Sequence, residues 1–181
     1  MSSGNVGGMK HLSDAEQAKK TGGMIALVPS AESVAKLLID GGEPAEDLHL
    51  TLAYLGKDVS VFDSSLGAVD AARAVADSSP AIYAKAMGHA TFNPSGDEPC
   101  AVYLIGDNPY LPELKSIVMD TLDSFYEMPY QHTPWIPHVT AGYDFEAADL
   151  DYTGPVVFDA VVATWGGEQH IFPLFDVGPP E

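Results

Sequence analysis

The sequence predicts an α+β fold built as one domain. Segments with helical periodicity and segments typical of strands follow one another without the regular alternation of a doubly wound sheet. No linker divides the 181 residues, of which 46% are apolar, so the chain can bury a sizeable core. Glycine and proline are frequent but not periodic, which indicates a globular rather than a fibrous protein.

The first half of the chain is expected to begin with an arm. Residues 1–21 start with a Gly- and Ser-rich stretch and are predicted to be flexible, with one short helix near 13–20, ahead of a single domain over 22–181. Ser30 has the position of an N-cap for a helix that continues to residue 39. Strands are expected at 24–28, 48–55 and 82–92, and an alanine-rich helix at 62–77.

The second half is expected to end in a hairpin. Turn-forming residues predict a loop at 93–99, and three prolines make 128–137 a rigid extended segment. Gly166 and Gly167 separate two apolar runs, as in a tight β-hairpin. Strands are expected at 101–105, 138–143, 156–165 and 169–174, and a helix at 112–126.

The charge of the chain limits the classes of molecule that it can bind. There are 26 Asp and Glu residues against 8 Lys and Arg, with a formal net charge of −18. Proteins that hold long nucleic acid neutralise many phosphates with basic residues, so no long nucleic acid partner is expected. A small substrate with one or two phosphates needs only a few donors. The acidity also fits a merely solvated surface.

The composition also bears on location. No apolar run reaches the roughly 20 residues of a membrane span, so no membrane association is expected. The start of the chain lacks the apolar core of a signal peptide, and Cys100 is the only cysteine. Both observations favour a cytoplasmic protein.

A repeated motif is the most informative feature of the sequence. Residues 49–54 and 138–143 both read His-x-Thr-x-x-Tyr with apolar residues between, about half the chain apart. Because side chains alternate along a strand, each strand presents its His and Thr on one face, about 7 Å apart. The same alternation predicts that Tyr54 and Tyr143 point into the core.

The remaining histidines lack this pattern. A third His-x-Thr, at 89–91, has no Tyr in register and lies beside Gly88, so we interpret it as structural. His11, His132 and His170 are expected in loops or on the surface.

Two imidazoles and two hydroxyls that converge would suit the cleavage of a phosphodiester. The reaction takes a proton from the attacking oxygen and gives one to the leaving oxygen, and imidazole can do either near neutral pH. His49 and His138 are therefore the candidate catalytic pair. Thr51 and Thr140 can donate hydrogen bonds to the non-bridging oxygens. No metal or other cofactor is required, and neither strand carries a Cys or a carboxylate on its His/Thr face, which disfavours a metal site.

These motifs resemble those of the two-histidine (2H) phosphoesterases, which include LigT-type RNA 2′,3′-cyclic phosphodiesterases, plant cyclic phosphodiesterases and bacteriophage anti-CBASS enzymes that degrade cyclic-oligonucleotide signals. Residues 49–56 are similar to the first family motif and residues 137–141 to the second, and the resemblance covers about residues 22–175. It implies a bilobal fold in which two antiparallel sheets face each other across a central groove, with helices outside. It also implies that His49 and His138 are catalytic.

By resemblance, Thr51 and Thr140 bind the substrate phosphate, and the enzyme hydrolyses small or cyclic nucleotides without a metal. The scarcity of basic residues departs from the RNA-acting members and favours small nucleotides over RNA. A role in bacteriophage counter-defence, in the host cytoplasm, is the corresponding biological expectation. The sequence does not fix the linkage that is cleaved or the oligomeric state.

Several alternatives stay open. The chain can be a 2′,3′-cyclic phosphodiesterase or a 2′–5′ enzyme that acts on RNA, a protein that sequesters a nucleotide without cutting it, or a virion or scaffold protein with a relic groove. Trp135, just before the second motif, can stack on a base or pack in the core. Most acidic residues near the motifs are expected to be solvated, although one of them can orient a histidine; before the first motif these are Glu43, Glu46 and Asp47.

Overall fold

The computed structural model describes residues 14–180, and it confirms the α+β class. The helices are α1 (Asp14–Ala18), α2 (Ala31–Leu37), α3 (Leu66–Ser78) and α4 (Leu111–Asp123). The strands are β1 (Gly23–Pro29), β2 (Leu50–Gly56), β3 (Ile82–Phe92), β4 (Cys100–Gly106), β5 (His138–Tyr143), β6 (Gly154–Trp165) and β7 (Glu168–Pro173). A one-turn 3-10 helix, Ala45–Asp47, precedes the first motif.

One antiparallel sheet holds all seven strands. Its order is β2-β1-β6-β3-β4-β5, and β7 also pairs with β6. The long strand β6 joins two halves: Phe158 pairs with Pro29 of β1 on one side and with Ile82 of β3 on the other, while β7 continues the line of β3 along the rest of β6. The two antiparallel sheets expected from the family resemblance are thus two halves of a single sheet that share β6.

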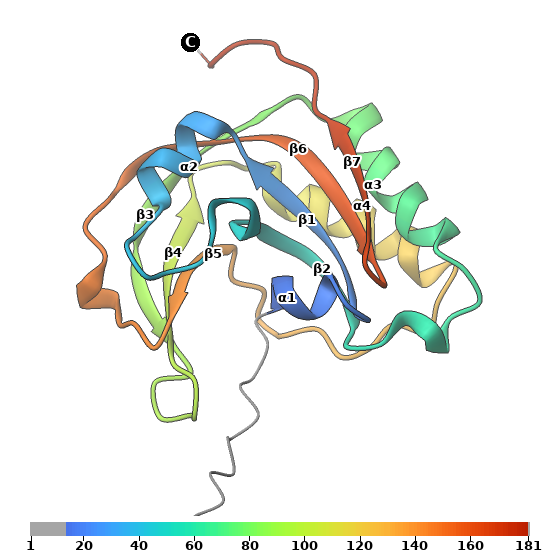
Figure 1. Cartoon of the computed structure of the whole chain (residues 1–181). Helices are drawn as coiled ribbons and strands as arrows, with labels where there is room; N and C mark the ends of the chain where they lie inside the picture. Colours follow the sequence, from blue (N-terminus) through green and yellow to red (C-terminus); the bar gives the residue numbers. More distant parts are fainter. Residues whose placement is uncertain (1–13, 181) are drawn as a thin grey trace, which may run out of the picture.

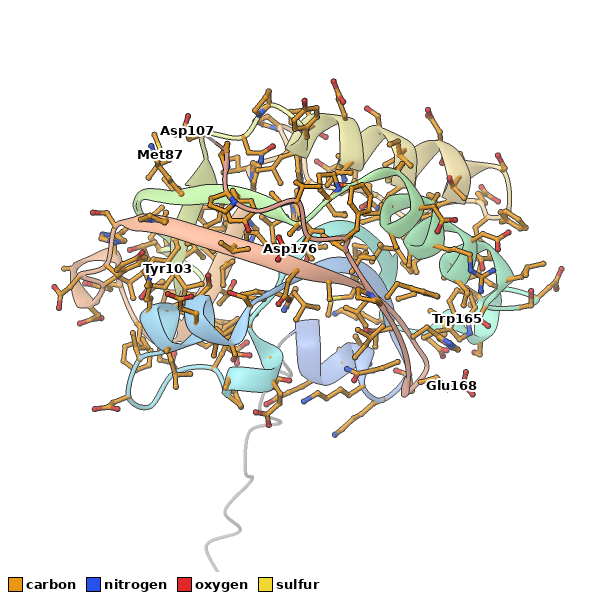
Figure 2. The ribbon with its side chains drawn as sticks, turned by 90° about the horizontal axis from the view of Figure 1, so that it is seen from above. Met87, Tyr103, Asp107, Trp165, Glu168 and Asp176 are labelled. Atoms are coloured by element: carbon orange, nitrogen blue, oxygen red, sulfur yellow. The ribbon has the colours of Figure 1, made fainter. Side chains whose placement is uncertain are left out.

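A large apolar core fills one side of this sheet. Helices α3 and α4 lie side by side, and α3 packs on β6 and β7 (Figure 1). Tyr103 of β4 is buried beside α2, and its hydroxyl donates to the carbonyl oxygen of Leu37 at 3.0 Å (Figure 2). Apolar residues from both halves of the sheet and from both helices belong to this core, among them Leu27, Leu52, Val75, Leu114 and Val139.

Local sequence signals explain most of the boundaries. The hydroxyl of Ser30 accepts a hydrogen bond from the amide of Ser33, so it caps α2 as expected. Gly166 and Gly167 both have positive φ, which gives the tight turn between β6 and β7. Helix α3 begins at Leu66, four residues later than the sequence predicts; Phe62, which ends the 3-10 turn Val59–Val61, has an extended backbone. In the described part of the chain, no helix is both long and apolar enough to cross a membrane.

Residues 14–21, part of the expected arm, contact the sheet on the side opposite to the large core. Ala18 of α1 is buried against Met24, Ala26 and Val162. The side chains of Gln17 and Thr21 both donate to the carbonyl oxygen of Lys57, at 3.0 and 2.6 Å. Helix α1 therefore lies on the sheet beside β1 (Figure 1). Residues 1–13, where the rest of the arm is expected, lie outside the described residues.

Candidate active site

The first motif lies at the start of β2. His49 immediately precedes the strand, and Thr51 is its second residue; both are half-buried. Leu50 and Leu52 are fully buried in the core on the opposite face, as the alternation predicts. The imidazole Nδ1 of His49 lies 2.7 Å from the main-chain oxygen of Asp47.

The second motif repeats this geometry at the start of β5. His138 is the first residue of the strand, and Thr140 follows on the same face; both are half-buried. Val139 and Ala141 are buried in the core. The Nδ1 of His138 lies 2.7 Å from the main-chain oxygen of Ile136, again two residues earlier in the chain.

These matched contacts fix the chemistry of both rings. A carbonyl oxygen only accepts hydrogen bonds, so each Nδ1 carries a hydrogen. In the neutral imidazole, the proton-accepting lone pair is then on Nε2. The two histidines can therefore exchange protons through the same ring atom, one as acceptor and the other, when protonated, as donor.

The two motif strands also lie next to each other. β2 and β5 are at opposite ends of the strand order, yet the sheet curls so far that they are in contact. Their inward residues, such as Leu52 and Val139, belong to one core. The outward faces, which carry the His and Thr side chains, are consequently on the same side of the molecule.

Each motif strand is held by the segment that precedes the other motif. The side-chain amide of Gln131 accepts from the amide of Tyr54 at 2.9 Å and donates to its carbonyl at 2.7 Å, along the free edge of β2. The amide of Glu43 donates to the carbonyl of Ala141 at 2.8 Å and covers the edge of β5. These reciprocal braces fix the two motifs relative to each other.

Trp135 takes part in the brace on β2. Its indole nitrogen donates to the carbonyl of Thr51 at 3.3 Å, and its ring packs against the core. The ammonium of Lys115 donates to the carbonyl of Leu52 at 2.8 Å and lies over the Trp135 ring; its partial burial lowers the pKa of Lys115. These contacts match the core-packing alternative for Trp135, and stacking on a base stays a prediction.

The expectation that both tyrosines point into the core is wrong. Along β2, Thr51 pairs with Ala26 and Tyr54 with Met24, two residues apart on β1, because a bulge at Leu52 inserts one extra residue. β5 has the same bulge, at Ala141: Thr140 pairs with Val102 and Tyr143 with Cys100 of β4. The bulges reverse the alternation, so each strand presents His, Thr and Tyr on one face.

The third His-x-Thr is structural, as expected. His89 pairs with Tyr103 and lies on the face of the sheet opposite to His138. Its Nε2 is 2.6 Å from the carbonyl oxygen of Tyr152, and the hydroxyl of Thr91 accepts from the amide of Ala147. Both side chains therefore fasten the segment after β5 to the sheet.

The other histidines stand apart from the two motifs. His170 is on β7 beside the carboxylate of Glu168, and His132 is exposed in the loop before β5, edge-on to Tyr130. His11 lies outside the described residues. Among residues 14–180, no group of three or more His, Cys, Asp or Glu side chains is placed to hold a metal ion.

Asp47 is the acidic residue that contacts a motif histidine. Its side chain is 3% exposed and forms an ion pair with Lys19, which follows α1 and is 41% exposed. This hydrogen bond to Asp47 raises the pKa of Lys19. The sequence assigned no role to Lys19, because nothing local links a lysine at 19 to a residue so far along the chain.

Comparison with known structures agrees with this architecture. The protein TT0787 of Thermus thermophilus aligns over 87% of this chain and 100% of its own length, with a TM-score of 0.61 and 16% sequence identity. E. coli LigT complexed with 3′-AMP aligns over 85% of this chain and 95% of its own, with a TM-score of 0.55 and 16% identity. The chain has the LigT fold.

LigT in its apo form aligns similarly, with a TM-score of 0.53 and 17% identity. No protein-family model and no curated protein sequence matches the chain. The LigT-like fold that the motifs led us to expect is thus confirmed by the three-dimensional structure.

Proposed function

We propose that this protein is a 2H phosphodiesterase that hydrolyses small or cyclic nucleotides with His49 and His138 as its proton-transfer pair. The main support is the matched geometry of the two histidines: each Nδ1 is held by the carbonyl two residues earlier, and both motif faces are on the same side of the LigT-like fold. This leaves the same nitrogen of both rings for catalysis.

The proposed reaction uses one neutral and one protonated imidazole. The neutral Nε2 takes a proton from water as its oxygen attacks phosphorus, while the protonated Nε2 gives its proton to the leaving oxygen as the phosphorus–oxygen bond breaks. Thr51 and Thr140 donate hydrogen bonds to the non-bridging oxygens, which gain charge in the transition state. The first imidazole then releases a proton to solvent and the second takes one up, which restores the starting pair.

A small substrate fits the charge of the chain. With 26 acidic and 8 basic residues, the protein repels a long polyanion, whereas one phosphate held by two threonine hydroxyls and one protonated imidazole needs no basic patch. E. coli LigT, which has the same fold, forms a complex with 3′-AMP, a mononucleotide. Hydrolysis of a cyclic-nucleotide signal, and with it a role in phage counter-defence, is the most specific form of this proposal.

A substrate panel tests the proposal. We expect the purified protein to convert at least one member of a set of 2′,3′-cyclic mononucleotides, 2′–5′ linked dinucleotides and 3′–5′ cyclic di- and trinucleotides, read by chromatography. EDTA should leave the rate unchanged; a loss of activity that a divalent metal restores would assign the site to a different class. Binding without turnover across the whole panel would favour the sequestering alternative.

A further inference from the structure

The surroundings of His49 include a charged pair that has no counterpart at the corresponding position of the second motif. Asp47, whose main-chain oxygen holds Nδ1 of His49, has an almost fully buried carboxylate. The corresponding residue for His138 is Ile136, which is apolar and exposed. The two histidines therefore donate the same hydrogen bond to the main-chain oxygens of two very different residues.

A buried carboxylate is costly unless a positive charge is next to it. Lys19 supplies that charge from the turn after α1. The main chain of Asp47 is fixed as well, since its amide donates to the carbonyl of Pro44 within the 3-10 turn. The side chain and the main chain of Asp47 are thus held together, and the ion pair with Lys19 keeps the carboxylate buried.

The turn that carries Lys19 is itself anchored. Gln17 and Thr21, on either side of it, donate to the carbonyl of Lys57 just beyond β2, and Ala18 is buried on β1. Lys19 is consequently held on the same side of the sheet as His49, and both line one cavity with Thr164.

We propose that Lys19 is a positioning residue for His49, acting through the buried carboxylate of Asp47 on the carbonyl that orients the imidazole. This inference rests on the proposed function for its catalytic consequence, but its effect on the ring does not. Without Lys19 the buried carboxylate turns outward to reach water, the 3-10 turn shifts, and Nδ1 of His49 loses its acceptor. A displacement of about 1 Å at a catalytic group can cost on the order of 10²-fold in rate.

Lys20 provides a matched control. It follows Lys19 in the same turn and is exposed, so Lys20→Met removes the same charge from the same place. Lys19→Met should lower kcat by about 10- to 100-fold on the panel substrate that is cleaved fastest, with KM nearly unchanged. Lys20→Met should match the wild type, and Lys19→Arg, which keeps the positive charge, should retain most of the activity.

A second measurement reports on the ring itself. Long-range ¹H–¹⁵N NMR of the ligand-free protein at pH 8, with His49 assigned from a His49→Gln variant, should show hydrogen on Nδ1 in the wild type, in Lys20→Met and in Lys19→Arg. In Lys19→Met we expect a mixture of tautomers. A loss of folded protein alone would not change the tautomer of the molecules that stay folded.

The outcomes separate this inference from the proposed function. An unchanged tautomer in Lys19→Met, together with turnover equal to that of Lys20→Met, would overturn the role of Lys19. So would a Lys19→Arg variant as impaired as Lys19→Met. If the wild type cleaves nothing on the panel while Lys19→Met still alters the tautomer, the positioning role stands and the proposed function fails.

Discussion

Each of the two motifs lies at the start of a strand, with a bulge after its threonine and the same contact between imidazole Nδ1 and a main-chain oxygen. Different parts of the chain hold the two strands in place. Long side chains cover the edge of β2, from Gln131, Trp135 and Lys115. The backbone of the loop before the first motif covers β5, where Gly42 and Glu43 approach the strand directly. The two motifs can thus share the same catalytic geometry although different contacts hold their strands in place.

This difference explains one departure between the motifs. Position 53 is a buried alanine, whereas the corresponding position 142 is glycine. A Cβ at residue 142 would lie 2.7 Å from the Phe145 ring and 3.0 Å from Cα of Gly42. The close backbone contact at β5 leaves no room for a side chain at position 142. The side chains that cover the edge of β2 leave room for the methyl group of Ala53.

Replacing either catalytic histidine is the strongest test of the equivalence of the two motifs. We expect His49→Ala and His138→Ala each to lower kcat by about 10²- to 10⁴-fold, because each removes one of two proton transfers. Circular dichroism should show an unchanged fold. His170→Ala, on β7, is the control and should keep wild-type turnover. Unchanged turnover in either motif variant would exclude that residue from proton transfer.

Replacing the motif threonines compares the two motifs at the phosphate. Thr51→Val and Thr140→Val keep the side-chain shape but lose the hydroxyl, and we expect each to lower kcat by about 10²-fold through loss of a donor to the transition state. Thr51→Ser and Thr140→Ser should retain most of the rate in steady-state kinetics. If only one valine variant is impaired, the phosphate is held by one motif, and the symmetric arrangement is wrong.

Glycine substitutions test how β5 is supported. A Cβ at residue 42 would lie 2.3 Å from the carbonyl oxygen of Ala141, so Gly42→Ala and Gly142→Ala should each lower the free energy of unfolding by about 1–3 kcal/mol in urea titrations. Gly88→Ala in β3 meets nothing within 4 Å and should be neutral or slightly stabilising. Tolerance of alanine at both sites would contradict the close backbone contact.

Trp135 variants separate its two roles. Trp135→Phe loses the hydrogen bond to Thr51 and should lower the free energy of unfolding by about 1 kcal/mol, measured in urea. Because phenylalanine keeps an aromatic ring, its KM should stay near that of the wild type. If Trp135 stacks on a base, Trp135→Ala should raise KM by about 10-fold or more, on the order of one stacking interaction. An unchanged KM in Trp135→Ala would leave only the structural role.

The smallest expected effect is a pH dependence of stability from Lys19. Its pKa is raised in the folded protein, so the ion pair stabilises the fold fully below the ordinary lysine pKa of about 10.4. That contribution is lost as the pH rises through the raised pKa. Urea titrations between pH 9 and 11 should show a steeper decline for the wild type than for Lys19→Met. Parallel curves would show that the exposed end of the pair is screened by solvent.

The sequence predicted most of the fold because the signals for it are local. The apolar run of β1, the cap at Ser30 and the glycine turn between β6 and β7 each act within a few residues. The His-x-Thr pairs were visible for the same reason, since alternation along a strand places both side chains on one face. The start of α3 was placed too early, since the backbone at Phe62 is extended after a 3-10 turn that the sequence did not reveal.

Features that depend on contacts between distant parts of the chain could not be predicted from the sequence. The bulges at Leu52 and Ala141 are set by pairing with β1 and β4, so counting along the motif alone put both tyrosines on the wrong face. The Lys19–Asp47 pair and the Gln131 brace join segments far apart in the chain, and single polar residues carry no signal of their partners. The two bulges are the reason that the motif tyrosines share a face with the motif threonines.

The reciprocal braces have a consequence for how the molecule could be divided. A fragment ending before β3 would contain the first motif but would leave the free edge of β2 without Gln131 and Trp135. The complementary fragment would leave β5 without Glu43. Exposed strand edges of this kind promote self-association. Neither half is therefore an autonomous unit, and the two would regain closed edges only by recombining.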